Sequence, residues 1–333
     1  MLRIAPALRA PHRFSFQPIC IAKRPFSTVN IPTFKISNKE RDAFIDAVKP
    51  FSQSPFTHYQ DLIRPLGRIF QQTMNPDLCH ELTKTVKEQK RHGFFLRNCP
   101  VNPNPGPTPD DDRHWPAKGF IEEFFLLGSC ALQQSRPFHD RQERHGDVFP
   151  QIITLKGHEE ESSSRGLNFP WHTEHIHLER TIDSIDLLCV KGDPNAVTEV
   201  LSVEGLIQGL PDWVVKGMQQ PIFEMQTGPS WPSLKIKRIQ PILERNQNGD
   251  FMLRFNSDFK HRLLGINDYA LRVLEHLTNH LSHVETYKVS LTPGDCLSVN
   301  NRRAAHQRTL FKPSTSHEDR RWLVGLYKQQ GEA

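Results

Sequence analysis

The feature that most constrains this chain is a pair of segments, far apart in sequence, that each place a histidine beside a strand-like run. The first segment, residues 169 to 174, reads Phe-Pro-Trp-His-Thr-Glu and supplies His172 and Glu174. The second segment begins at Pro293-Gly294-Asp295 and ends at His306. Two histidines and one carboxylate on one face of a metal leave the opposite face open, as in non-haem Fe(II) oxygenases. The sequence therefore favours a fold that brings the two segments together.

The H-x-[DE] pattern of the first segment is weak when taken alone. It starts at six positions, which are His145, His158, His172, His177, His283 and His317. His172 differs from the others because aromatic and apolar residues precede it and the strand-like run 185 to 190 follows it. In an extended segment His172 and Glu174, two residues apart, project to the same side and can hold one ion.

The second segment is more specific. Pro-Gly-Asp is typical of a turn, and Leu297 and Val299 alternate as in a strand that leads towards His306. Arg321 then opens the apolar run 322 to 327, which predicts another strand. A guanidinium can form a bidentate pair with a carboxylate, as a dicarboxylate co-substrate would require.

In these motifs the sequence resembles the clavaminate synthase-like branch of the TauD/TfdA group of Fe(II)/2-oxoglutarate-dependent dioxygenases. The resemblance covers roughly residues 90 to 328 and includes Gly93–Arg97, residues 136 to 152 and the serine run 162 to 164. Glutamate at the carboxylate position favours this branch, since most of the wider group has aspartate there. The resemblance implies a mixed α+β fold with a double-stranded β-helix (jelly roll) core and flanking helices.

The resemblance also implies roles for particular residues. His172, Glu174 and His306 would bind Fe(II), while Arg321 and Thr198 would bind the distal carboxylate of 2-oxoglutarate. Arg320 competes with Arg321 for that role, but Arg321 stands directly before the tryptophan, as the family pattern requires. The implied reaction uses O2 to oxidise a small-molecule metabolite and releases succinate and CO2. Hydroxylation is the leading outcome, with desaturation or ring closure as alternatives.

Two other functions stay open at this point. The chain could be a metal-binding jelly-roll protein without oxidative activity, although an intact ligand set argues against this. It could also be a zinc-dependent hydrolase, because two histidines and a glutamate are a known zinc ligand set. A hydrolase would need a general base beside the metal-bound water, and it would have no use for Arg321.

One departure from the family pattern concerns the substrate. Amino-acid hydroxylases of this branch have a second arginine, four residues after the first, that holds the substrate's α-carboxylate, and here that position is Gly325. Arg302, Arg303 or Arg308 could replace it, although structural or solvated roles are the simpler interpretation of each. We therefore expect a modified, conjugated or non-amino-acid metabolite as the substrate.

The remaining histidines and cysteines indicate no further site. Strand alternation would turn His175 to the face opposite His172, and we interpret both His175 and His177 as structural or supporting residues. The six cysteines lie far apart without C-x-x-C spacing, which is typical of reduced thiols rather than of a disulfide framework or a zinc ribbon.

Charge and hydropathy exclude two kinds of partner. Residues 1 to 28 hold five basic residues and no acid, so they account for the whole net charge of +5. The rest of the chain is balanced, which gives no reason to expect a nucleic-acid partner. The same composition predicts a mitochondrial presequence, and the alternative is a disordered basic tail on a cytoplasmic enzyme. No apolar run approaches the roughly 18 residues of a membrane span.

Several elements can be placed along the chain. We expect an N-terminal helical segment over 29 to 92, packed on a dioxygenase domain over 93 to 330. A proline-rich loop over 99 to 116 is predicted to lie near the site. A helix should begin at Pro76, and residues 241 to 255 should form a hairpin that turns at Asn248-Gly249. A second helix is predicted over 269 to 281, with Leu271, Leu274, Leu277 and Leu281 facing the core.

Overall fold

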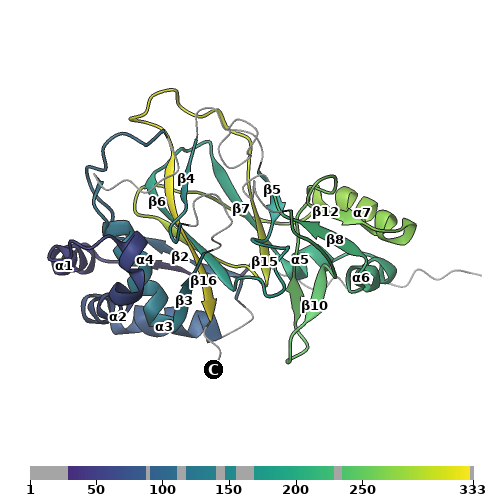
Figure 1. Cartoon of the computed structure of the whole chain (residues 1–333), viewed down its shortest axis with the longest axis horizontal. Coiled ribbons are helices and arrows are strands. Elements are labelled where there is room, and N and C mark those ends of the chain that lie inside the picture. Colours follow the sequence, from purple (N-terminus) through teal and green to yellow (C-terminus); the bar gives the residue numbers. More distant parts are fainter. Residues whose placement is uncertain are drawn as a thin grey trace, which may run out of the picture.

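The structure is a computed structural model, and it describes residues 29–87, 91–110, 118–139, 147–154, 169–228 and 235–330. The predicted presequence, the serine run 162 to 164 and the second part of the proline-rich loop lie outside the described residues. Between these gaps the chain folds into layers of sheet and helix, which Figure 1 shows from the side.

A seven-stranded sheet forms the central layer, in the order β1-β2-β14-β6-β16-β3, with β4 also paired to β16. Its strands are β1 (Thr33–Lys35), β2 (Gly93–Arg97), β3 (Ser135–Phe138), β4 (Gln151–Ile153), β6 (Ser184–Lys191), β14 (Cys296–Asn300) and β16 (Trp322–Gln330). The apolar runs predicted as strands correspond to β6, β14 and β16. These strands are buried on both faces, because another layer of the molecule covers each side of the sheet.

Helices cover one face of this sheet. They are α1 (Asn38–Val48), α2 (Pro55–Thr73), α3 (Pro76–Lys87) and α4 (Ile121–Leu132). A capping box formed by Ser37 and Glu40 starts α1. Phenylalanines of α1, α2 and α4 meet the sheet side chains Leu188, Trp322 and Val324 in one apolar cluster. The helices therefore hold the back of the sheet and leave its other face for the second sheet.

A four-stranded sheet, β13-β7-β15-β5, packs on that other face. Its strands are β5 (Phe169–His172), β7 (Val197–Ser202), β13 (Tyr287–Ser290) and β15 (Ala304–Arg308). Leu187, Leu297 and Leu323 of the large sheet meet Val200 and Ala304 of the small sheet in a shared core. Because side chains alternate along a strand, His306 and Arg308 lie on the same inner face as Ala304.

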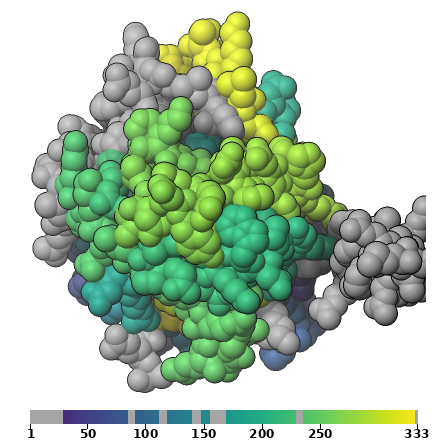
Figure 2. Space-filling model, turned by 90° about the vertical axis from the view of Figure 1, so that its right-hand side faces the viewer, coloured from purple at the N-terminus to yellow at the C-terminus, as the bar shows by residue number. Residues whose placement is uncertain are grey.

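A third layer closes the far side of the small sheet. It holds the three-stranded sheet β12-β8-β9 and the short hairpin β10-β11. The elements are α5 (Val203–Ile207), α6 (Asp212–Met218), β8 (Phe223–Gln226), β9 (Lys237–Gln240), β10 (Leu243–Arg245), β11 (Phe251–Leu253), β12 (Leu263–Gly265) and α7 (Asp268–Leu281). Seen from this side, the green and yellow-green residues of this layer make up most of the described surface (Figure 2).

The local predictions in this part of the chain are largely confirmed. A helix begins at Pro76, a hairpin turns through Asn248-Gly249, and α7 ends at Leu281. The prediction for Leu271 is wrong, because its side chain is 54% exposed. Ala270, Val273, Leu274 and Leu277 form the buried stripe instead. A 3.6-residue period accommodates either set, and only the position of the neighbouring β-layer decides which face is covered.

The proline-rich loop is anchored at its base by buried charges. Lys118 donates to Glu123 at 2.7 Å and to Glu122 at 3.0 Å, and all three side chains are almost completely buried. Asn102, near the other end of the loop, donates its backbone N–H to Glu122 at 2.7 Å. A buried carboxylate is costly without such partners, so this contact fixes where the loop leaves and re-enters the body of the protein.

The predictions on the cysteines and on membrane spans can be compared with the structure. The described cysteines, Cys79, Cys99, Cys130, Cys189 and Cys296, are all free thiols. None of the helices within the described ranges has both the length and the apolar character needed to cross a bilayer.

Candidate active site

Two neighbouring strands of the small sheet bring the predicted histidines together. β15 pairs with β5 so that His306 stands opposite His172. The two imidazole ring centroids are 4.2 Å apart. On its other side β15 pairs with β7, with His306 opposite Val200. Cross-strand pairing thus joins the two sequence segments directly.

Glu174 reaches the same place from a turn rather than from a strand. β5 ends at His172, and His175 follows Glu174 with a φ of 53°, so the segment is not extended through this point. Asn301, which is completely buried, holds the turn: its Oδ1 accepts from the backbone N–H of Glu174 at 2.6 Å, and its Nδ2 donates to the Glu174 carbonyl at 3.1 Å. The carboxylate therefore has a fixed origin beside the two rings.

The three side chains form a compact donor cluster. Glu174 Oε1 lies 3.4 Å from His172 Nε2 and 3.3 Å from His306 Nε2. One nitrogen or oxygen of each residue lies within 4.8 Å of the others, and within the described ranges no other such group of His, Cys, Asp or Glu is found. Adjacent ligands about 2.1 Å from a metal at right angles would be roughly 3 Å apart. The observed separations fit one shared ion.

Hydrogen bonding and burial also fit the cluster to a cation. His172 Nδ1 donates to the Pro170 carbonyl at 2.8 Å, which turns Nε2 towards Glu174. Burial, together with the nearby His172, lowers the pKa of His306. Burial alone would raise the pKa of Glu174, but the two histidines hold it well below its usual value. His172 Nε2 is buried and has no hydrogen-bond partner among the described residues, so a metal ion bound there would satisfy it.

A second polar group lies at one end of the space between the sheets. Thr198 of β7 stands opposite Arg308 of β15, and Arg321 directly precedes β16 in the large sheet. All three are buried. Burial lowers the pKa of Arg321 to about 10, and burial together with the charge of Arg321 lowers the pKa of Arg308 to about 9. The buried positive charges of Arg308 and Arg321 therefore favour the binding of an anion beside them.

The two consecutive arginines have different surroundings. The Arg320 guanidinium donates to Asp110 at 3.2 Å and to the Thr154 carbonyl at 3.3 Å, and Thr108 donates to the Arg320 carbonyl. Arg320 thus holds the proline-rich loop. The Arg321 guanidinium makes no hydrogen bond or ion pair with any residue of the part of the chain that the structure describes, although only 7% of Arg321 is exposed. A buried guanidinium in these surroundings can donate hydrogen bonds to the carboxylate of a ligand.

Gly325, at the position of the missing second arginine, lies against Pro150, which directly precedes β4. Gly325 lies on β16 with the same orientation as Leu323, facing the small sheet. Its N–H donates to the Pro150 carbonyl at 2.9 Å. A Cβ atom at Gly325 would lie 2.9 Å from Pro150 Cγ. Any side chain at this position would therefore require Pro150 or the strand to shift.

The structure places the three arginines considered as replacements in different regions. Arg302 pairs with Asp183 at 2.5 Å, and Arg303 pairs with Glu204, at the end of β14 far from Arg321. Neither can replace the missing cation, and they have the structural role that was the simpler interpretation. Arg308 instead lies beside Arg321, which strand parity with His306 could have indicated.

The neighbouring histidines do not join the cluster. His175 is turned away by its left-handed backbone, not by strand alternation as predicted, and its ring packs edge-on against Phe138 and Tyr327. His177 is buried next to it, with ring centroids 5.9 Å apart. Asn301 was missed by sequence reasoning. The turn after β14 was visible in the Asn-Asn pair, but nothing local indicated that it holds Glu174.

Comparison with known proteins finds a family model that matches part of this chain. The model of the family described as "Taurine catabolism dioxygenase TauD, TfdA family" matches residues 224–327, which include His306 and Arg321 but not His172. The chain is therefore related to the TauD/TfdA family, as its motifs predicted. His172 and Glu174 lie outside the matched residues, and the structure places both beside His306.

Curated relatives include amino-acid oxygenases. The L-lysine 3-hydroxylase of Catenulispora acidiphila is 26% identical over 204 residues, which are 59% of this chain and 55% of that protein. The L-ornithine/L-arginine 3-hydroxylase of the same organism is 26% identical over 252 residues, covering 66% of this chain and 71% of that protein. The L-asparagine oxygenase of Streptomyces coelicolor is 27% identical and covers 60% of this chain and 58% of that protein. The alignments thus span from about half to about two thirds of these relatives.

Solved structures show that the fold is shared over most of the chain. Asparagine oxygenase in complex with Fe(II), 2S,3S-3-hydroxyasparagine and succinate has a TM-score of 0.78 at 19% identity, over 90% of this chain and 93% of that chain. The non-haem iron oxygenase OrfP in complex with Fe, succinate and (3S)-hydroxy-L-Arg has a TM-score of 0.76 at 20% identity, over 90% and 94%. At these identities the likeness concerns the fold.

Proposed function

We propose that this protein is an Fe(II)- and 2-oxoglutarate-dependent dioxygenase that oxidises a small-molecule metabolite, with His172, Glu174 and His306 as its iron ligands. The observation that carries the proposal is the buried cluster in which Glu174 Oε1 lies 3.4 Å from His172 Nε2 and 3.3 Å from His306 Nε2. The hydroxylases and oxygenases among the relatives support the same class, as do the structural neighbours that hold Fe with succinate or 2-oxoglutarate. The facing sheets would then be the two halves of a jelly roll.

Each residue has a defined task in this proposal. Bound Fe(II) supplies the activation of O2 and the oxidation of 2-oxoglutarate to succinate and CO2. His172, Glu174 and His306 would hold the metal ion. Arg321 and Thr198, with Arg308 beside them, hold the distal carboxylate of 2-oxoglutarate. The apolar residues between the sheets exclude water from the site.

The first test separates this function from a zinc hydrolase and from a catalytically inactive metal-binding protein. The metal-free protein should form succinate from 2-oxoglutarate only after Fe(II) is added, and addition of zinc should give none. Hydrolysis with zinc and no iron-dependent succinate would favour the hydrolase. Tight metal binding with no turnover under any substrate would favour the inactive protein.

The Asn301 contacts give a graded test of the metal site. Asn301→Ala removes the hydrogen bonds to the Glu174 backbone but leaves all three ligands in place. Loss of such supporting contacts typically costs about 10- to 100-fold in metal affinity. We expect the Fe(II) dissociation constant to increase by a factor in that range, as measured by competition with a chelator. An unchanged constant would mean that the turn holds Glu174 without Asn301.

The substrate is proposed to be a metabolite without a free α-carboxylate at the usual position. Glycine stands at position 325, and a Cβ atom there would lie 2.9 Å from Pro150 Cγ, so the family's substrate-binding arginine has no equivalent at this position. A carboxylate buried without a cation is costly. An amidated, acylated or otherwise modified metabolite avoids that cost.

Matched pairs of compounds test this substrate proposal. We expect the amides of L-arginine, L-lysine and L-asparagine to be oxidised at least as fast as the free acids, with product formed in equal amount to succinate. The charge-assisted bond that a free α-carboxylate lacks here would contribute about 1.5 to 3 kcal/mol. Its absence should lower kcat/KM for the free acids roughly ten- to hundredfold. Fast, tightly coupled hydroxylation of any free proteinogenic amino acid would contradict the proposal and leave the metal assignment intact.

A further inference from the structure

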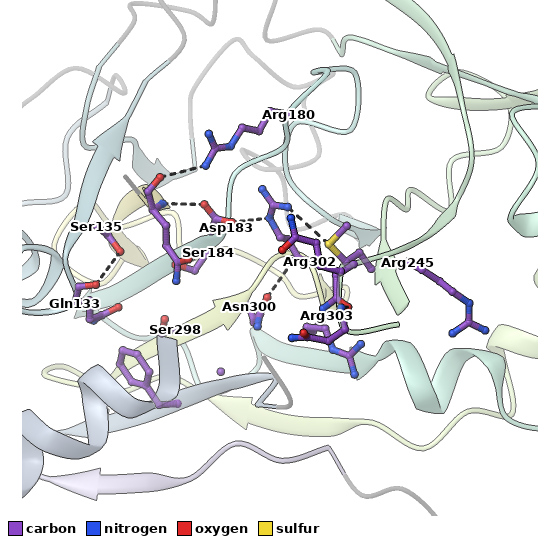
Figure 3. A pocket seen from close by; sticks show the side chains of 17 residues that line it. Gln133, Ser135, Arg180, Asp183, Ser184, Arg245, Ser298, Asn300, Arg302 and Arg303 are labelled. Atoms are coloured by element: carbon purple, nitrogen blue, oxygen red, sulfur yellow. Dashed lines mark hydrogen bonds and ion pairs between the residues drawn. The ribbon is translucent and has the colours of Figure 1, made fainter. Parts of the chain in front are cut away.

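A groove lies between helix α2 and β3, the last strand of the seven-stranded sheet as described. Its volume is about 530 Å³, which is within the range of small-molecule sites. Strand β3 begins at Ser135, which Figure 3 shows beside Gln133 in the lining of another cavity, and the groove shares no described lining residue with that cavity. We call it the edge groove, and the described residues that line it are Tyr59, Gln60, Ile63, Arg136, Pro137, Phe138, His139 and Gln329.

Strand pairing explains how both faces of the sheet contribute to the edge groove. Phe138 stands opposite Tyr327 of β16, and Arg136 stands opposite Gln329. Because side chains alternate along a strand, Arg136 and Phe138 share one face of β3, and Pro137 points to the other face. The helices cover that second face, so α2 supplies the other wall of the groove.

Much of the wall is apolar or aromatic. Tyr59 and Ile63 line it from α2, and Pro137 and Phe138 line it from β3. The Tyr59 ring also packs edge-on against His139, with ring centroids 6.0 Å apart. Such a wall removes the hydrocarbon part of a ligand from water, which favours binding.

Two polar side chains of the groove lack a hydrogen-bond partner within the described part of the chain. Gln329 is 7% exposed, and its amide makes no hydrogen bond with any described residue. The Nδ1 atom of His139 is buried and also has no such partner, while its Nε2 lies 3.5 Å from the Tyr59 hydroxyl. A buried polar group is costly without a partner, so these two groups favour a ligand that has polar atoms of its own.

Arg136 supplies the fixed charge of the edge groove. No carboxylate is among the described residues that line it. The Arg136 guanidinium is exposed and makes no ion pair or hydrogen bond within the residue ranges that the structure covers. A guanidinium with open donors can bind a carboxylate through two hydrogen bonds. Because Arg136 and Gln329 are cross-strand neighbours, both can donate to the same carboxylate.

We propose that the edge groove is a binding site for a small monocarboxylate with an apolar body. The carboxylate accepts hydrogen bonds from Arg136 and Gln329, and the body lies against Ile63, Pro137 and Phe138. One fixed positive charge beside an apolar wall matches one carboxylate better than it matches a polyanion. The proposal does not rest on the function assigned to the metal centre.

A pair of rings connects the groove with the candidate metal centre. Phe138 packs edge-on against His175, with ring centroids 5.3 Å apart, and His175 directly follows Glu174. The described lining of the groove contains none of the three candidate metal ligands and neither Arg321 nor Thr198. We therefore expect the groove to bind its ligand while 2-oxoglutarate is also bound.

Calorimetric titration of the full chain with phenylacetate tests this site, in the presence of saturating 2-oxoglutarate. Phenylacetamide has the same shape without the charge, so it should bind roughly ten- to hundredfold more weakly than phenylacetate. Arg136→Gln should remove this preference for the charged compound. Arg136 is exposed, so the variant should fold normally.

Two further variants complete the experiment. Gln329→Ala should weaken phenylacetate binding by about tenfold, because it removes a hydrogen bond to a charged group. Arg68→Gln is the matched control, since it removes an exposed arginine of α2 outside the described lining, and it should bind phenylacetate like the unmodified protein.

Equal binding of phenylacetate and phenylacetamide, or phenylacetate binding that is unchanged in Arg136→Gln, would overturn the proposal. The absence of phenylacetate binding at millimolar concentration would also overturn it. Binding that appears only when 2-oxoglutarate is left out would place the carboxylate at the co-substrate site and contradict the proposal as well.

Discussion

Replacing His172 or His306 with alanine should abolish Fe(II) binding and 2-oxoglutarate turnover while the protein keeps its fold. In the proposed site each histidine would supply one of the three protein ligands, and both side chains lie outside the three apolar clusters that form the core of the described residues. Loss of one ligand should reduce turnover to the level of the metal-free protein. Metal analysis, succinate release and thermal unfolding together check the three parts of this expectation.

His283→Ala is a matched control for these two variants. His283 also begins an H-x-E sequence, but its side chain is exposed and its ring hydrogen-bonds only locally, to Ser282 and Asn279. We expect this variant to retain iron and activity. If His306→Ala kept both iron and full turnover, the assignment of the three ligands would be wrong.

Arg321→Ala should raise the apparent KM for 2-oxoglutarate far more than Arg320→Ala. The Arg321 side chain is buried near Arg308, whereas Arg320 is committed to Asp110 and the Thr154 carbonyl. A charge-assisted bond contributes about 1.5 to 3 kcal/mol, or roughly ten- to hundredfold in affinity. Steady-state kinetics with 2-oxoglutarate as the varied reactant measures the difference.

Arg320→Ala serves as the control for this comparison. It should lower thermal stability by loosening the proline-rich loop, while the KM for 2-oxoglutarate stays close to that of the unmodified protein. A larger KM effect in Arg320→Ala than in Arg321→Ala would show that the co-substrate arginine is shifted by one residue along this strand.

The residues of the candidate site could be predicted because each stands at a recognisable point of local structure. His306 follows a turn and a strand, and Arg321 directly precedes an apolar run that became β16. The fold was predictable to the same extent, since the apolar runs gave β6, β14 and β16. The pairing of His172 with His306 depends on strand register, which the family resemblance implied and local pattern did not.

Other parts of the structure depend on long-range contacts that no local pattern contains. Asn301 holds Glu174 across a separation of 127 residues. The exposed side of α7 was assigned wrongly at Leu271 because helical periodicity does not say which side the next layer covers. Arg302 and Arg303 could be told from substrate-binding arginines only once Asp183 and Glu204 were seen to pair with them.

The central claim is that one buried site binds both a metal ion and 2-oxoglutarate. Anaerobic calorimetric titration of 2-oxoglutarate into the Fe(II)-loaded protein tests it most directly, because no substrate has to be known. We predict binding of one equivalent that is lost in the metal-free His306→Ala protein and weakened at least about tenfold in Arg321→Ala. Binding of 2-oxoglutarate that is equally tight without metal and without Arg321 would contradict the account, as would no binding to the Fe(II)-loaded protein.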